Sequence, residues 1–395
     1  MAVEHANILE RILSNAGPPR PEDFTSPVHD ERVVARIGVW IGAAMGICFL
    51  TGLISHYQQH PVGWLPLGPD PAWGYRLTQG THVLTGTLLL PLILAKLFSA
   101  YPRLFSRPPV RGLVHLVDRL SVGLLIAATI FQIATGLANT AQYYPWKHFG
   151  FVGTHYTVAW LSVGALCLHI AFKLPVIQRA LGHPLEDDEA DHAQGQRRRA
   201  FLIGAFTVTA GTALLTAGQT VYPLRRLAFL APRRPDVGPQ HLPINRTAEA
   251  AGVLTSAADP SWRLHVSGPS GDVHLSRAQL TEMTEATERL PIACVEGWSA
   301  DATWSGVPIR ALVSLAGGGP HSTVLVESLE QKGYYARTQL PAAYAADPRT
   351  LLALRLNGED LAVDHGYPAR IIAPNRPGVL QTKWVAKLTV SPEPS

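Results

Sequence analysis

The chain has 395 residues, of which 16% are charged, and a formal net charge of +4. Typical soluble domains are about 25% charged, yet the mean hydropathy of +0.11 is too low for a chain that is membrane throughout. The long apolar runs lie before residue 222, and the remainder is typical of a soluble domain. Composition therefore excludes both a wholly soluble enzyme and a pure channel or carrier.

The N-terminal half is expected to be an all-α transmembrane helical bundle of five spans. A hydrocarbon core of about 30 Å requires about 20 apolar residues per helix. After a polar cytoplasmic segment at 1–33, the bundle covers 34–222, and the spans are expected at 34–56, 79–101, 118–141, 153–175 and 201–222. The fifth is the weakest prediction because it is rich in Thr and Gly.

Basic residues set the expected orientation. They concentrate in the N-terminal segment and in the loops after the second and fourth spans, whereas the opposite loops hold only Arg76 and Lys147. The positive-inside rule then places the N-terminus in the cytoplasm of a multi-pass cell-membrane protein, with the C-terminal domain extracytoplasmic. Arginines that flank spans give no reason to expect a nucleic-acid partner. Arg198 and Arg199, just before the fifth span, resemble a twin-arginine export signal.

Three histidines inside the predicted spans could hold haem iron. His82 and His155 lie about one turn from the same end of their helices, and His169 follows His155 by fourteen residues, or about 21 Å along a helix. Neutral imidazoles facing each other across a bundle are haem ligands. The spacing resembles that of membrane di-haem b-type cytochromes, so haem b is the expected cofactor, one or two per chain.

The iron partner of His169 is left open between two candidates, His115 and His29. If His169 has no partner, the bundle holds one haem. His56 and His60 could serve the outer haem or only a helix interface. The alternative for all of these histidines is that they are polar residues lining helix contacts, although ionisable groups at this depth are usually functional.

A Pro- and Arg-rich linker at 223–244 leads to a C-terminal domain at 245–395 that is expected to be mixed α+β and strand-rich. Short segments that alternate apolar with polar residues predict strands. They are WRLHVSG, DVHLS, RLPIACVEG, STVLVESL, LLALRLNG, ARIIAP and KWVAKLTV. Helices are expected at Ser276–Ala286, after a Ser N-cap, and at Ile309–Leu315.

Cys294 is the one cysteine of the C-terminal domain, since Cys48 and Cys167 lie in predicted spans. It therefore has no disulfide partner within that domain. It could be a small buried hydrophobe, a nucleophile, or a thiolate ligand of a soft metal.

Three motifs in order resemble the molybdopterin domain of the sulfite oxidase family, over about residues 245–390. They are CVEGWS at 294–299, WSGVP at 304–308 and DHGYPARIIAPNRPGVLQTKWV at 364–385. The first is most similar to the bacterial exported methionine-sulfoxide-reductase branch. The resemblance implies a molybdenum-molybdopterin cofactor with Cys294 as the catalytic metal ligand. It also implies that His365, Arg370 and Lys383 contact the pterin, together with Asn245.

Where eukaryotic-type members of that family carry sulfite-binding arginines, this chain has Val295-Glu296-Gly297-Trp298. Sulfite is therefore not the expected small-molecule substrate. The combined parts predict an oxidoreductase that passes electrons from quinol through haem to a site that reduces S-oxides or N-oxides outside. Two alternatives stay open, a dehydrogenase that delivers electrons to quinone, and a haem-only electron-transfer protein with a non-catalytic outer domain.

Overall fold

The computed structural model describes residues 23–62, 64–65, 67–105, 110–144, 150–187 and 189–392. Its contacts divide the chain into two compact units. Unit 1 comprises residues 1–46, 86–135 and 147–211, and unit 2 comprises residues 47–85, 136–146 and 212–395. Several long helices therefore contribute to both units.

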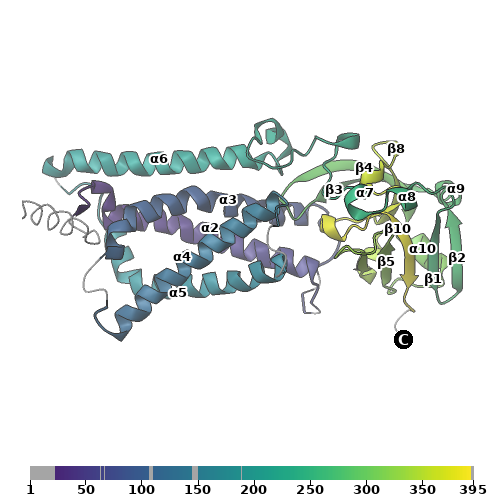
Figure 1. Cartoon of the computed structure of the whole chain (residues 1–395), viewed down its shortest axis with the longest axis horizontal. Helices are drawn as coiled ribbons and strands as arrows, with labels where there is room; N and C mark the ends of the chain where they lie inside the picture. Colours follow the sequence, from purple (N-terminus) through teal and green to yellow (C-terminus); the bar gives the residue numbers. More distant parts are fainter. Residues whose placement is uncertain are drawn as a thin grey trace, which may run out of the picture. The chain divides into compact units, whose positions relative to one another are not determined.

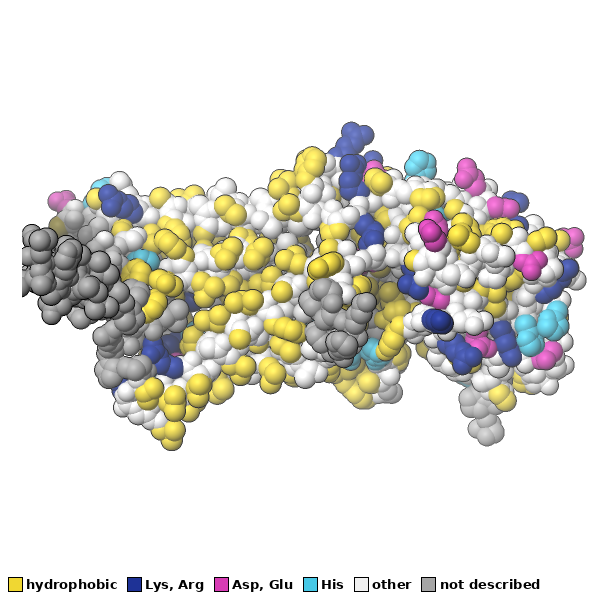
Figure 2. Space-filling view, viewed as in Figure 1, with side chains coloured by type: hydrophobic (Ala, Val, Ile, Leu, Met, Phe, Trp, Pro, Cys, Tyr) yellow, Lys and Arg dark blue, Asp and Glu magenta, His cyan; other side chains and the backbone are white. Residues whose placement is uncertain are grey.

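Five helices of the described chain are long and apolar enough to cross a membrane, as the sequence predicts. They are α2 (Glu31–Gln59), α3 (Gly74–Ala100), α4 (Leu113–Thr140), α5 (Phe151–Gly182) and α6 (His192–Ala217) (Figure 1). Apolar side chains such as those of Trp40, Leu94 and Ile203 are exposed along them (Figure 2). Exposed apolar residues at this density are what a bilayer requires. The last helix ends at Ala217, earlier than predicted.

Short 3-10 helices flank the spans: η2 (Pro27–His29), η3 (Tyr101–Phe105), η4 (Glu189–Asp191) and η5 (Tyr222–Leu227). Arg198 near the start of α6 is buried and forms ion pairs with Asp191 at 2.6 Å and with Asp30 at 3.3 Å. Arg32 pairs with the same Asp30 at 2.7 Å. A buried arginine needs such partners, so Arg198 has a structural role that is independent of export.

The C-terminal domain is strand-rich and contains two five-stranded sheets. The first has the order β2-β1-β10-β5-β6, and β1 runs parallel to β10. Its strands are β1 (Arg263–Gly268), β2 (Gly271–Ser276), β5 (Val324–Ser328), β6 (Arg337–Leu340) and β10 (Val385–Val390). The second has the order β3-β4-β7-β8, with β9 paired to β7. Its strands are β3 (Ala286–Ala293), β4 (Ser299–Pro308), β7 (Leu351–Leu356), β8 (Glu359–Asp360) and β9 (Arg370–Ile372).

Short helices precede the first strand and join the later ones. They are η6 (Pro239–His241), α7 (Ala248–Ala251), α8 (Leu254–Ala257), α9 (Arg277–Glu282), α10 (Ile309–Leu315), α11 (Ala342–Ala345), η7 (Val363–His365) and η8 (Gly378–Leu380). The prediction for α10 is confirmed. The helix predicted from Ser276 does begin there, with a capping box between Ser276 and Gln279. It ends at Glu282, however, and strand β3 already begins at Ala286, so the predicted helix was too long.

The larger apolar core of the domain contains residues from both sheets and from α10. Leu312 of α10 is fully buried in it, whereas Leu315 on the same helix is 42% exposed. The two leucines therefore provide a matched pair for testing the core.

We expect Leu312→Ala to destabilise the domain by about 2–5 kcal/mol, because it removes buried methyl groups and leaves a cavity. Leu315→Ala should change stability by under about 1 kcal/mol. Thermal unfolding of the two purified variants, followed by tryptophan fluorescence, measures the difference. Equal shifts in the two variants would contradict this assignment of the core.

Candidate molybdenum and haem sites

The segment Cys294–Trp298, here called the cysteine turn, closes the hairpin between β3 and β4. Ala293 pairs with Ser299 across the two strands. The Cys294 N–H donates to the Trp298 carbonyl at 2.9 Å, and the Gly297 N–H donates to the Cys294 carbonyl at 3.0 Å. Gly297 has φ +98°, which a glycine adopts without strain. The CVEGW motif therefore forms a tight turn, and Cys294 is its first residue.

The Cys294 side chain is a free thiol and is 1% exposed. Burial first, and the charge of Glu296 second, raises the pKa of this thiol. The apo thiol thus keeps its proton, and a bound metal cation would displace that proton. A Cβ added to Gly378 would lie 3.5 Å from the Cys294 Cα, so the segment after β9 packs directly on the cysteine turn.

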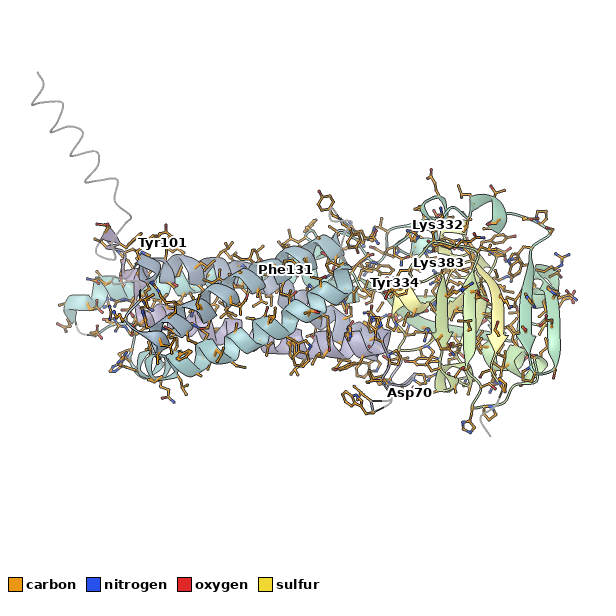
Figure 3. The ribbon with its side chains drawn as sticks, turned by 60° about the horizontal axis from the view of Figure 1, so that its bottom comes forward. Asp70, Tyr101, Phe131, Lys332, Tyr334 and Lys383 are labelled. Carbon is orange, nitrogen blue, oxygen red and sulfur yellow. The ribbon has the colours of Figure 1, made fainter. Side chains whose placement is uncertain are left out.

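Two cations, the buried Arg370 and the half-buried Lys383, lie in the last third of the domain. Arg370 is 1% exposed, and its guanidinium donates to the carbonyls of His365 at 3.0 Å and Gln381 at 3.4 Å. Lys383, labelled in Figure 3, donates to the carbonyls of Asp364 at 2.8 Å and Arg246 at 3.0 Å. Within the described chain neither cation forms an ion pair. Burial lowers the pKa of Arg370 to about 10 and, with the charge of Arg370, that of Lys383 to about 7.

His365 is placed beside these cations. A Cβ on Gly366 would lie 3.0 Å from the Arg370 Cβ and 3.2 Å from the Lys383 Cβ. His365 is 1% exposed, and its Nε2–H donates to the Pro239 carbonyl at 2.8 Å. Burial lowers the pKa of His365 to about 4. The ring is therefore neutral, with an acceptor at Nδ1.

These residues fit an anionic, deeply held cofactor. The two cations donate to carbonyl oxygens and lie over the rings of Trp304 at 5.0 Å and Trp384 at 5.4 Å. None of these groups carries a full negative charge, and a phosphate would supply one. Asn245, the remaining predicted pterin contact, lies before α7, and its carbonyl accepts a hydrogen bond from Gln142 at 2.7 Å. No group of three or more metal-ligating side chains occurs in the described residues.

Residues outside the sheets also hold the cysteine turn, and they were not predicted from the sequence. Within unit 2, the Gln79 amide of α3 donates to the Val295 carbonyl at 2.6 Å, and the Asn139 amide of α4 donates to the same oxygen at 3.3 Å. The Thr220 hydroxyl donates to the Gly297 carbonyl at 2.7 Å. No sequence signal could have identified them, because polar residues at span ends are usual and their partners lie at least 77 residues away.

Glu296 in the cysteine turn is 4% exposed and is hydrogen bonded to Arg233 of the linker and to Gln142. The Trp298 indole N–H also donates to it at 3.0 Å. Burial raises the pKa of Glu296, although Arg233 opposes that shift. Arg233, an arginine beside the turn, is therefore paired with a carboxylate of the protein.

The bundle histidines differ in how their Nδ1 atoms are engaged. In unit 2, His82 Nδ1 contacts the Cys48 carbonyl at 2.8 Å. In unit 1, His155 Nδ1 contacts the Thr135 hydroxyl at 2.9 Å, and that hydroxyl donates its own proton to the Phe131 carbonyl at 2.7 Å. Both histidines must therefore carry the proton on Nδ1, which leaves the lone pair on Nε2. This tautomer, oriented by an outer hydrogen bond, fits an iron ligand.

Among the other predicted haem residues, His29 resembles His82, whereas His115 and His169 differ from it. His115 Nδ1 accepts a hydrogen bond from the Arg111 N–H at 3.2 Å, so its lone pair at Nδ1 is already used. His29 Nδ1 donates to the Ser99 carbonyl at 3.2 Å. The His169 Nδ1 is buried and has no hydrogen-bond partner in the described residues. The rings of His56 and His60 lie 4.8 Å apart.

Comparison with known proteins identifies a family for the C-terminal domain and relatives of the chain. Residues 251–395 match the family described as oxidoreductase molybdopterin binding domain. The chain is 30% identical over 132 residues to the putative protein-methionine-sulfoxide reductase subunit YedZ1 of Azospira oryzae, which covers 33% of this chain and 49% of that protein. It is 31% identical over 166 residues to mitochondrial sulfite oxidase of Homo sapiens, which covers 35% and 30%.

A third relative is the NADPH nitrate reductase of Beauveria bassiana, 36% identical over 99 residues, which covers 24% of this chain and 11% of that protein. The chain spans less than half the length of each of these relatives. The C-terminal domain is a sulfite oxidase-family molybdopterin oxidoreductase domain, as the sequence predicts.

The buried His365 predicts how the domain responds to acid. The folded-state pKa is about 4, whereas an unfolded histidine titrates near about 6.5. As the pH falls below 6.5, only the unfolded chain takes up this proton, so His365 removes up to about 3 kcal/mol of stability by pH 4. Thermal unfolding of the purified protein between pH 7 and 4.5 should show this loss. His365→Gln should flatten the pH dependence, and the exposed His274→Gln should leave it unchanged. An unaltered profile in His365→Gln would contradict the prediction.

Proposed function

We propose that this protein is a membrane-anchored molybdenum oxidoreductase that passes electrons from a membrane quinol, through b-type haem, to an oxygen-atom-transfer site at Cys294. The substrates are S-oxides or N-oxides. In this proposal the N-terminus lies in the cytoplasm and the C-terminal domain outside.

The observation that carries the proposal is the contact between the cysteine turn and helix α3. A Cβ on Gly297 would lie 2.8 Å from the Val83 side chain, so the turn touches the residue that follows His82. Gln79, three residues before His82, donates to the carbonyl of the residue that follows Cys294. Within unit 2, His82 as a candidate haem ligand and Cys294 as the candidate molybdenum ligand therefore lie on segments that contact each other. The contacts are made by Gln79 and Val83 of α3.

Each group of residues has a defined task in this mechanism. His82 and His155 would hold haem iron through Nε2. Cys294 would hold molybdenum, and His365, Arg370, Lys383 and Asn245 would hold the pterin. When bound, the molybdenum cofactor supplies two-electron oxygen-atom transfer, and haem supplies one-electron transfer. The hydrogen bonds from Gln79, Asn139 and Thr220 keep the cysteine turn at a constant position relative to α3.

Reduction of an uncharged oxide is favoured over oxidation of sulfite by the charges at the cysteine turn. The buried Glu296 disfavours a second anion, and its partner Arg233 is already engaged. The sulfoxide named in the description of the Azospira relative is an uncharged group of this kind. The direct test is to reduce the purified protein with a quinol analogue, add methionine sulfoxide, dimethyl sulfoxide or trimethylamine N-oxide, and follow haem reoxidation. Haem reduction by sulfite without quinol would instead support the dehydrogenase direction.

We expect Cys294→Ser to lower oxide-dependent haem reoxidation at least about 100-fold, since even outer residues of metal sites contribute 10–100-fold. Molybdenum content should fall with it while haem content stays unchanged. The control is Cys167→Ser, an exposed thiol on α5, which should leave both metals in place. Unaltered protein that contains haem but no molybdenum would make the haem-only alternative correct.

His82→Ala and His155→Ala together should abolish the Soret band of the proposed outer haem, because they remove the two residues that would hold its iron. His115→Ala should retain the band, since its Nδ1 is engaged by the Arg111 amide. Absorption spectra of the purified variants at equal protein concentration measure this. A Soret band that survives the double substitution would show that other residues hold the haem.

A further inference from the structure

Within unit 1, four ionisable side chains gather where α3 and α5 approach their C-termini and α4 begins. They are Lys96, Asp118, His169 and Lys173, here called the inner-end cluster. The Lys173 ammonium pairs with Asp118 Oδ2 at 2.7 Å. The Lys96 ammonium donates to the Val34 carbonyl at 2.8 Å. His169 lies one helical turn before Lys173 on α5, and therefore on the same face of that helix.

Two buried atoms of this cluster lack a hydrogen-bond partner in the part of the chain that the structure describes. They are Asp118 Oδ1 and His169 Nδ1. The Asp118 side chain is only 13% exposed. Buried polar groups are almost always satisfied, and leaving one unsatisfied is unfavourable. Two of them in a single cluster indicate that a ligand with two hydrogen-bond donors completes it.

His169 also differs from the haem-ligand candidates of this chain. In His82 and His155 the Nδ1 atom carries a proton that a protein oxygen accepts. In His169 the same atom has no such oxygen within the described residues. His169 with its proton on Nε2 presents Nδ1 as an acceptor, which suits a small-molecule hydroxyl better than an iron ligand.

The charges and the location narrow the chemical class of the ligand. With His169 neutral, two lysines and one aspartate leave an excess positive charge, which stabilises a ligand that becomes anionic when it loses a proton. All four residues lie on membrane-spanning helices. The ligand must therefore have an apolar body, two acidic hydroxyls and access through the bilayer. The Lys173 side chain is 37% exposed, so the cluster opens to the bundle surface.

We propose that the inner-end cluster binds the hydroquinone head group of the membrane quinol, with one hydroxyl donating to Asp118 Oδ1 and the other to His169 Nδ1. This inference rests on the proposed function, in which quinol is the electron donor. On oxidation, the hydroquinone becomes a quinone and loses two electrons and two protons. The two protons pass to His169 and to the Asp118 carboxylate, and the haem of the proposed function, when bound in its ferric form, would accept the two electrons one at a time.

The test locates the binding site without relying on turnover. Full-length protein in lipid nanodiscs is photolabelled with a short-chain azidoquinone, and the labelled peptides are mapped by mass spectrometry. We expect label on the segments around Lys96, Asp118 and His169. Asp118→Asn and His169→Gln should each weaken labelling about tenfold, as expected for losing a hydrogen bond to a strong acceptor. Arg179→Gln, which removes an exposed cation farther along α5, should label like the unaltered protein.

Several outcomes would overturn the inference. Label confined to the opposite ends of the helices would place the quinol elsewhere. Loss of one haem per chain in His169→Gln, measured by pyridine haemochrome, would make His169 an iron ligand. If quinol reduces haem equally well in all variants, the inner-end cluster is wrong but the quinol-dependent function stands. If quinol fails to reduce haem in the unaltered protein and no specific label forms, the proposed function fails as well.

Discussion

The buried cysteine turn is the constraint on which the rest of the C-terminal domain depends. A thiol can be held at 1% exposure only if the backbone groups around it are hydrogen bonded, because unsatisfied polar groups in the interior are unfavourable. Within the hairpin of β3 and β4, the hydrogen bond from the Cys294 N–H to the Trp298 carbonyl satisfies two of these backbone groups. Gln79, Asn139 and Thr220 satisfy two further carbonyls. The metal-ligand candidate is therefore positioned partly by residues of the span ends.

Positive charge with incomplete compensation is common to the proposed pterin site and the inner-end cluster. In the C-terminal domain, Arg370 and Lys383 donate to carbonyl oxygens and have no carboxylate partner among the described residues, which fits the phosphate of a pterin. In unit 1, the inner-end cluster carries excess positive charge and two unused acceptors, which fits a hydroquinone. Buried polar and charged groups need partners, but the two sites need different ones. The cations of the C-terminal domain need an anion, whereas the acceptors of the inner-end cluster need hydroxyl donors.

Most of the elements could be predicted from local patterns, and the failures have specific causes. The spans follow from apolar length alone, and α10 follows from its apolar spacing. Strand β4 was not among the predicted strands because Asp301, Gly306 and Pro308 interrupt its pattern. It is nevertheless stable, since it is paired on both sides, with β3 and with β7. The helix after Ser276 was predicted too long because propensity does not show where pairing with β4 begins.

The sequence by itself determined the five spans, the strand-rich domain and the identity of Cys294 as its solitary thiol, because these depend on composition, periodicity and motif order. Only the tertiary structure decided which groups surround that thiol. Gln79, Asn139, Gln142, Thr220 and Arg233 are polar residues of a common kind, and their role comes from contacts across long stretches of chain. The tautomers of His82 and His155, and the unsatisfied atoms of Asp118 and His169, likewise depend on which oxygens lie within hydrogen-bond distance. A linear pattern does not contain that information.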